Sequence, residues 1–229
     1  MLFRSEEAER LGRAHSLPFI SEVLAQPWKG LAWLLAGRLA EGISQLRGAM
    51  ETLNAQHGGE LWMPYWRAVL AEGLAVSGDL AGGLRLIEEG LTQIVRPGWE
   101  ERWCLAEVLR LKGEILLMQE STEQGARSRE QRAKGQEHGA KIETDPRPLT
   151  PDPQSEAEAC FLQAIEVAQE QHAKSWELRA STSLARLWQQ QSKKTEAHQM
   201  LSKIYHWFTE GFDTKDLKEA KGLLEELSR

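Results

Sequence analysis

The sequence predicts an all-α protein: a right-handed solenoid of about four long helix pairs that ends in a capping helix. Three observations support this prediction. One spacing of apolar residues recurs about every 40 residues, small residues stand where two helices would approach each other, and no segment shows the alternation of apolar and polar residues that is typical of a strand. Repeats of this length, each a pair of helices, stack so that every pair buries its apolar face against its neighbours.

The repeated unit is a small residue, a bulky apolar residue four positions later and a third, mostly small, residue three positions after that. Another small residue precedes three of the four sets by twelve positions, and in the third set Gly113 takes this role, 44 positions before Ala157. Small residues let two helix backbones approach, and the bulky residue fills the space beside them. With the preceding small residue first, the sets are Gly30, Gly42, Leu46, Ala49; Ala71, Gly83, Ile87, Gly90; Gly113, Ala157, Phe161, Ala164; and Ala185, Ala197, Leu201, Ile204.

Helices are expected in order along the chain, separated by short turns with glycine or polar residues. The first, 5–14, has no partner helix before it and reads as the second half of a pair. Pro27 should kink or split the second helix, and Asp79 should cap the helix that follows it. The predicted helices are 5–14, 17–36, 39–54, 61–77, 80–95, 100–119, 155–171, 175–191, 194–208 and 213–228.

The segment 121–153 differs from the rest of the chain. It holds four of the eight prolines, six basic and six acidic residues, and only Ile142 and Leu149 as large aliphatic side chains. Such a composition buries too little apolar surface to offset the entropy of ordering. We therefore predict a disordered insertion within the third repeat, either without a role or regulatory.

The C-terminal segment 213–228 is predicted to be the capping helix of a single domain that comprises residues 1–229. Asp213 can cap it, and Asp216 lies in the first turn, where a negative charge is favourable. A helix that is apolar on one side and polar on the others can close an array. The apolar side is formed by Leu217, Ala220, Leu224 and Leu227.

Composition excludes several classes of protein. The net charge of −6 argues against a nucleic-acid partner, which needs a basic surface. No run of apolar residues is long enough to cross a membrane, and the N-terminus does not resemble a signal peptide. Cys104 and Cys160 lie in apolar helical patterns and lack a CxxC context, so we expect two buried thiols and a cytoplasmic location.

Histidine and tryptophan are the other residue types that could carry chemistry. His15, His57 and His172 end predicted helices, where they would cap carbonyl groups; no acidic or cysteine ligand stands beside them, so we predict no metal site and no cofactor. Trp62 and Trp176 each stand 21 residues before a repeat anchor. This register favours packing between repeats over a ligand cage.

The phrases RLKGE, ELRASTSLARLW and WFTEGFDTKDLKEAK, with GRLAEGISQLRGAMETL as an earlier repeat, resemble the C-terminal tetratricopeptide-repeat region of large bacterial signalling proteins. Those proteins carry a class III adenylate or guanylate cyclase domain and an AAA-type ATPase domain before the repeats. The resemblance covers most of the chain except 121–153 and implies a regulatory or binding module. It carries over no catalysis, because the chain has no GxxxxGK[ST] phosphate loop.

In tetratricopeptide arrays the first helix of each pair lines the concave face, and this implies a partner-binding surface here. Glu107 would neighbour Arg179, and Glu114 would neighbour Arg186. These charged side chains would either link adjacent repeats or bind the charged or polar groups of a partner. The predicted surface comprises Tyr65, Glu72, Glu107, Arg110, Glu114, Arg179, Thr182 and Arg186, with Ala68 between the first two.

The predicted function is that of a non-catalytic interaction or regulatory module, the C-terminal part of a cyclase or ATPase signalling protein. Its partner would be a protein or peptide, or the attached ATPase or cyclase domain. A free-standing adaptor that assembles other proteins is the alternative, and a small-molecule sensor is a third reading. We expect no enzymatic activity.

Overall fold

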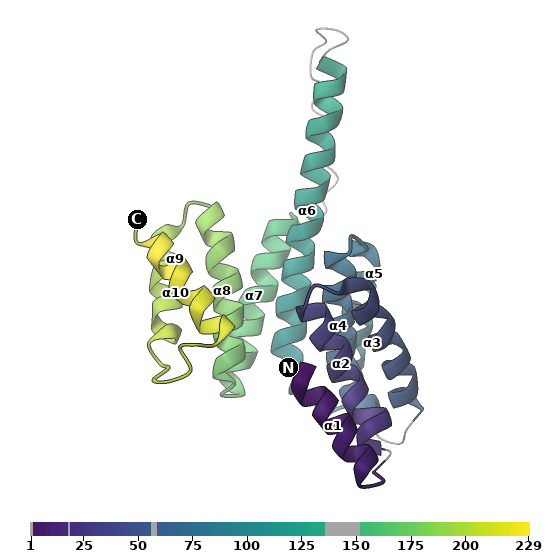
Figure 1. Cartoon of the computed structure of the whole chain (residues 1–229). Coiled ribbons are helices and arrows are strands. Elements are labelled where there is room, and N and C mark those ends of the chain that lie inside the picture. The colour runs from purple at the N-terminus through teal and green to yellow at the C-terminus, as the bar shows by residue number, and fades with distance from the viewer. Residues whose placement is uncertain (1, 18, 56–58, 136–151) are drawn as a thin grey trace. The chain divides into compact units, whose positions relative to one another are not determined.

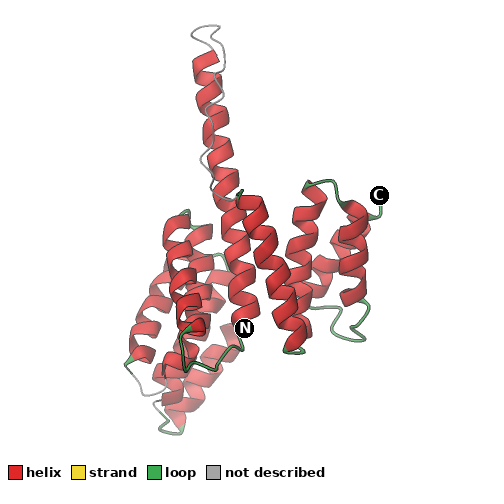
Figure 2. Cartoon of the chain, turned by 180° about the vertical axis from the view of Figure 1, so that it is seen from behind, coloured by secondary structure: helices red, strands yellow, loops and turns green. Residues whose placement is uncertain are grey.

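The structure, a computed structural model, describes residues 2–17, 19–55, 59–135 and 152–229. Every regular element in these residues is a helix and none is a strand (Figure 2), which confirms the predicted all-α class. Two short elements differ from the α-helix: η1 (Phe19–Leu24) is a π-helix and η2 (Gly59–Trp62) is a 3-10 helix. The α-helices are α1 (Leu2–Ala14), α2 (Ala25–Leu35), α3 (Leu39–Asn54), α4 (Met63–Val76), α5 (Leu80–Val95), α6 (Leu105–Gly135), α7 (Pro153–Glu170), α8 (Lys174–Gln190), α9 (Lys194–Tyr205) and α10 (Lys215–Leu227).

The chain divides into two compact units, Met1–Leu111 and Lys112–Arg229; that they belong to one domain stays a prediction. The boundary falls inside α6. In the first unit α2 packs against α3 and α4 against α5, while α1 lies against α2. In the second unit α8 packs against both α7 and α9, and α10 contacts α8 and α9 (Figure 1). Helices that are neighbours in sequence are therefore neighbours in space.

The repeated residues form the buried contacts between paired helices. All twelve members of the four sets are buried, and so are the four small residues that precede them. A methyl group added to Gly30 on α2 would lie 2.6 Å from Cγ of Leu46 on α3. A methyl group on Gly113 would lie 2.5 Å from the ring of Phe161. The bulky residue thus fills the space that the small residue leaves, and Gly113 is confirmed as the counterpart in the third pair.

Pro27 acts on the helix that contains it, as predicted. The backbone is a π-helix up to Leu24 and an α-helix from Ala25. Proline has no amide hydrogen, so the carbonyl of Val23, four residues earlier, loses its normal partner. The change of helix type next to this position splits the predicted 17–36 helix into η1 and α2.

The predicted cap of α5 is confirmed, whereas the starts of α10 and α6 differ from the predictions. The amide of Gly82 donates to Asp79 Oδ1 at 2.9 Å, so Asp79 caps α5 as expected. The cap of α10 is Thr214 and not Asp213, and no side chain bonds the free amides there. Helix α6 begins at Leu105, after a turn in which the amide of Leu105 bonds the carbonyl of Arg102.

The prediction that 121–153 is disordered is wrong for 121–135, because α6 continues through Gly135; 136–151 lie outside the described residues. Residues 121–129 are exposed, so the expected lack of burial is confirmed, and no other described helix of the second unit runs beside them (Figure 1). Side chains one turn apart bond each other: Gln124 donates to Glu120 at 2.6 Å and Arg127 to Glu123 at 3.4 Å. Extending an existing helix needs no new nucleation, so good helix formers can continue it without a core.

Candidate functional site

The eight residues of the predicted surface all lie on first helices of pairs. They fall in both units, so they are described in two groups. Helix α4 and the first turns of α6 belong to the first unit, while the rest of α6 and all of α8 belong to the second. The first group is Tyr65, Glu72, Glu107 and Arg110, and the second is Glu114, Arg179, Thr182 and Arg186.

Glu107, Arg110 and Thr182 are buried, which corrects the expectation that they face a partner. Glu107 is 4% exposed and Arg110 is 7% exposed. Arg110 donates from two nitrogens to the two carboxylate oxygens of Glu107, at 2.8 and 2.9 Å. This fork neutralises both charges and makes burial tolerable. The hydroxyl of Thr182 donates to the carbonyl of Leu178 at 2.8 Å, within its own helix.

Glu114 joins two helices of the second unit. The hydroxyl of Ser183 on α8 donates to Glu114 Oε1 on α6 at 2.5 Å, and Ser183 is itself buried. A carboxylate that bonds a buried hydroxyl holds the two helices in register. The predicted proximity of Glu107 to Arg179, which belong to different units, stays a prediction.

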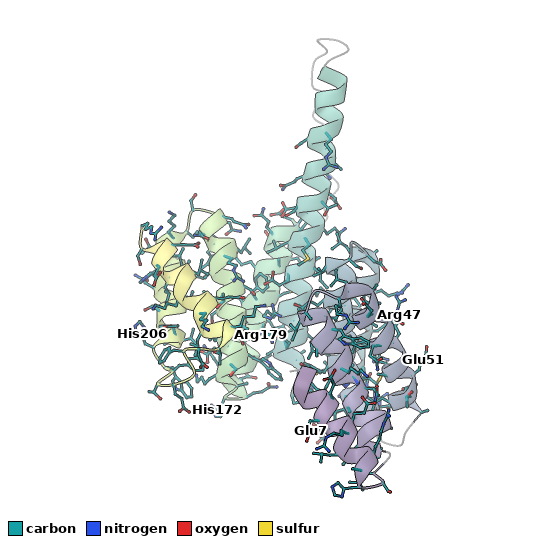
Figure 3. The ribbon with its side chains drawn as sticks, viewed as in Figure 1. Glu7, Arg47, Glu51, His172, Arg179 and His206 are labelled. Carbon is teal, nitrogen blue, oxygen red and sulfur yellow. The ribbon has the colours of Figure 1, made fainter. Side chains whose placement is uncertain are left out.

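Arg179 and Arg186 point toward the C-terminal helix. Arg186 forms an ion pair with Glu219 on α10 at 3.0 Å, and Arg179 lies 4.0 Å from Asp216 on the same helix. Figure 3 marks Arg179 on α8. Burial by itself would raise the pKa of Glu219, but the hydrogen bond and charge of Arg186, together with Lys215, outweigh it and hold that pKa below its ordinary value. The acidic side of α10 thus neutralises the two arginines of α8.

A groove of about 400 Å³ lies between α8 and α10. Gly222 leaves it open, since a methyl group there would meet no atom within 4 Å. Leu223 supplies an apolar wall, and charged and amide side chains supply hydrogen-bond donors and acceptors. The groove is lined by Arg186, Gln189, Gln190, Glu219, Gly222, Leu223 and Glu226.

Cysteine and histidine are the remaining residue types that could carry chemistry. Burial raises the pKa of the Cys104 thiol to about 12; its backbone hydrogen bond opposes this shift and the charge of Glu107 adds to it. His206 places Nδ1 2.8 Å from the carbonyl of Ser202 at the end of α9, and His57 lies outside the described residues. In the described ranges no three His, Cys, Asp or Glu side chains are placed to hold a metal ion. Nor does any helix there have the length and apolar character needed to cross a membrane.

An aromatic cluster in the first unit extends the predicted packing of tryptophans between repeats. Trp28 on α2 contacts Tyr65 on α4, with ring centroids 6.4 Å apart. Tyr65 contacts Trp103, which precedes α6, at 5.3 Å, and Trp103 contacts Trp62 at 5.4 Å. These four residues are called the aromatic strip below. They join consecutive helix pairs, so the predicted packing role of Trp62 is confirmed, but Trp28 and Trp62 are also 40% and 39% exposed.

The sequence reasoning missed a groove of about 590 Å³ beside α4 and α5. Arg67 lies 3.7 Å from Glu89, and Arg96 pairs with Glu60 at 2.8 Å. Charged positions three and four residues apart on α5 could have indicated this face. No residue of the predicted surface lines the groove, which leaves the groove between α8 and α10 as the candidate site closest to the prediction.

No known protein family matches the chain in a scan against family profiles. A search among curated proteins finds no similar sequence either. Segments such as ELRASTSLARLW, which ends at Trp188, resemble cyclase and ATPase signalling proteins. Membership of that group therefore stays a prediction.

Proposed function

We propose that this protein is a non-catalytic interaction module of the tetratricopeptide type, acting in the cytoplasm, that binds a protein or peptide in the groove between α8 and α10. The resemblance in sequence favours the C-terminal region of a cyclase or ATPase signalling protein. The attached domain would then be the regulated partner. A free-standing adaptor would use the same groove for a separate protein.

One observation supports the proposal. The groove is open where Gly222 lacks a side chain, and the charged side chains that border it can bond a ligand in place of each other. Arg186 and Glu219 are paired with each other, both are partly exposed, and both line the groove. A peptide that enters can bond the guanidinium, the carboxylate or the amides of Gln189 and Gln190 while its apolar side chains contact Leu223. Interfaces of this kind combine an apolar floor with a polar rim.

The test has two variants that alter the groove in different ways. Arg186→Glu reverses the charge opposite Glu219, and Gly222→Gln fills the opening while improving helix propensity. Both should reduce partner capture from the source cell, or the regulated activity of an attached ATPase or cyclase. Truncating one partner of a desolvated interfacial charge pair costs about 2–5 kcal/mol of binding.

Matched controls separate the groove from general charge and helix effects. Arg47→Glu reverses an exposed charge on α3 (Figure 3), and Gly125→Gln places the same side chain on the exposed part of α6, where it meets nothing. Both should behave as wild type. If the two groove variants stay folded and retain full capture and regulation, the proposed function at this groove is wrong.

The regulatory and adaptor forms of the proposal differ in the identity of the partner. An ATPase domain encoded in frame upstream of Met1 would favour the regulatory form. A captured separate protein whose binding depends on Arg186 would favour the adaptor.

A further inference from the structure

The aromatic strip is both a packing element and an exposed surface of the first unit. Trp66 lies beneath it, 3% exposed, with its ring centroid 5.0 Å from that of Trp28. This buried ring fixes the rings above it, which therefore lose little conformational freedom when a ligand binds. Rigid, partly exposed tryptophans are typical of the residues that dominate binding energy at interfaces.

The exposed tryptophans of the strip differ from other tryptophans of the chain in what covers their rings. Arg38 lies over Trp33 with 4.8 Å to the ring centroid, and Arg96 lies over Trp99 at 4.7 Å. The ammonium group of Lys174 lies 5.8 Å from the ring centroid of Trp207, which is 58% exposed. Among the described residues no cation lies over Trp28 or Trp62.

Unpaired negative charge stands next to the strip. Glu100 and Glu101 are exposed and precede Trp103 by three and two residues, which keeps their Cα atoms within about 11 Å of it. No described residue forms an ion pair with either carboxylate. Glu60, near Trp62, differs from them because Arg96 already pairs with it.

We propose that the aromatic strip, together with Glu100 and Glu101, binds a basic peptide segment in which arginine or lysine alternates with apolar side chains. The cation would lie on the open ring face of Trp28 or Trp62, and the carboxylates would attract it. The apolar neighbours would contact the ring edges. This inference rests on the proposed function as an interaction module and adds a second surface with a defined partner chemistry.

Charge separates this occupant from others that aromatic rings can bind. Single-stranded nucleic acid also stacks on aromatic side chains, but it needs a basic groove for its phosphates. Here the exposed charged residues directly before Trp103 are Glu100, Glu101 and Arg102, with a net charge of −1, and the chain as a whole carries −6. A neutral ligand would lack the ionic attraction to Glu100 and Glu101.

The test uses the full chain and three fluorescein-labelled peptides of equal length, followed by fluorescence anisotropy. One peptide alternates arginine and leucine, the second has the neutral isostere citrulline in place of arginine, and the third has glutamate. The arginine peptide should bind most tightly, with affinity that falls as salt rises. Binding of the citrulline peptide with equal affinity would overturn the inference.

Variants then locate the site. Trp62→Ala and the double variant Glu100→Gln/Glu101→Gln should each lower the affinity for the arginine peptide by about tenfold. The double variant changes only exposed side chains, so it tests the proposal even if Trp62→Ala disturbs the fold. Trp207→Ala and Glu196→Gln/Glu210→Gln, all at exposed positions, are the matched controls in the second unit, and neither should change the affinity. A third variant, Glu225→Gln/Glu226→Gln, reports binding in the groove between α8 and α10, because Glu226 lines that groove.

The outcomes distinguish this inference from the proposed function. Equal losses in strip and control variants would mean non-specific attraction and would overturn the proposal. A loss confined to Glu225→Gln/Glu226→Gln would place the peptide in the groove between α8 and α10, which overturns the strip and supports the groove. A chain that binds none of the peptides also overturns the inference, while the groove remains to be judged by the Arg186 and Gly222 variants.

Discussion

At the scale of single residues, the close approach of paired helices depends on one missing side chain. A methyl group on Gly30 would lie 2.6 Å from Cγ and 3.1 Å from the backbone nitrogen of Leu46. A flexible side chain can move, but a backbone atom of a packed helix cannot move alone. Gly48 is also in the middle of a helix, yet a methyl group there would meet no atom within 4 Å.

Gly30→Ala and Gly48→Ala should therefore have opposite effects. The first should overpack the interface between α2 and α3 and lower the free energy of unfolding by about 1–3 kcal/mol. The second should raise it by about 0.5–1 kcal/mol through helix propensity. Urea unfolding of both variants measures the difference. Changes of the same sign would contradict the proposed packing.

Cys104 gives a second prediction at this scale. Its pKa of about 12 leaves almost no thiolate at pH 8, and its side chain is buried. Since the thiolate is the reactive form, iodoacetamide should not alkylate Cys104 in the folded protein and should do so quickly in urea. Mass spectrometry of the peptide that contains Cys104 provides the readout. Rapid alkylation without denaturant would show that this part of the chain opens readily.

At the scale of elements, α10 is held to α8 by apolar packing and by charge. Leu217, Ala220, Leu224 and Leu227 are buried, as the sequence predicted. The ion pair of Arg186 with Glu219 is 46% and 38% exposed on its two side chains, so solvent screens it. Its contribution to stability should be small, whereas the proposed function gives it a role in binding.

A double-mutant cycle with Arg186→Gln and Glu219→Gln should give a coupling energy of about 0–1 kcal/mol at pH 7. The folded pKa of Glu219 lies below its ordinary 4.5. A lowered carboxyl pKa adds stability above the unfolded value, and this contribution disappears as the pH falls through the folded value. The coupling should therefore persist at pH 5 and vanish in stronger acid. A coupling that grows on acidification would contradict the direction of the shift.

The exposed C-terminal part of α6 allows a test of how much a helix without tertiary contacts contributes to stability. Ala126→Pro should reduce the helical circular dichroism signal but change the global free energy of unfolding by less than about 0.5 kcal/mol, because residues 121–129 bury nothing. Ile115→Pro in the buried part of the same helix should cost about 3 kcal/mol or more. Similar losses for the two variants would mean that the extension packs on other parts of the protein.

At the scale of the whole molecule, the two units should differ in their response to a single core substitution. Phe161 on α7 is fully buried, with its ring against Gly113 on α6, and Phe161→Ala should cost about 3–5 kcal/mol. Helix pairs contact mainly their neighbours, so the loss should remain local.

Hydrogen exchange followed by mass spectrometry can show this localisation. In Phe161→Ala, amides of α7, α8 and α9 should exchange faster, while those of α2 to α5 should keep the wild-type rate. Equal acceleration in both units would mean that the chain unfolds as one cooperative body, in contrast to its division at Leu111.

The sequence by itself determined most of the helical segments and the buried residues of the repeat pattern. Predicted helices 39–54 and 80–95 match α3 and α5 at both ends, and every repeat residue is buried. These features follow from local spacing, since residues three and four apart share one helix face and small residues mark close contacts. Composition likewise showed that 121–129 stay exposed, although it did not reveal the helix there.

Only the tertiary structure decided what each exposed face contacts. Glu107 and Arg186 both belong to the predicted surface, yet the first is buried in an ion pair with Arg110 and the second borders a groove beside α10. The aromatic strip likewise requires three helix pairs to bring Trp28, Tyr65 and Trp103 together. Periodicity orients a side chain relative to its own helix axis, whereas burial, ion pairing and ring contacts depend on the helices that pack against it.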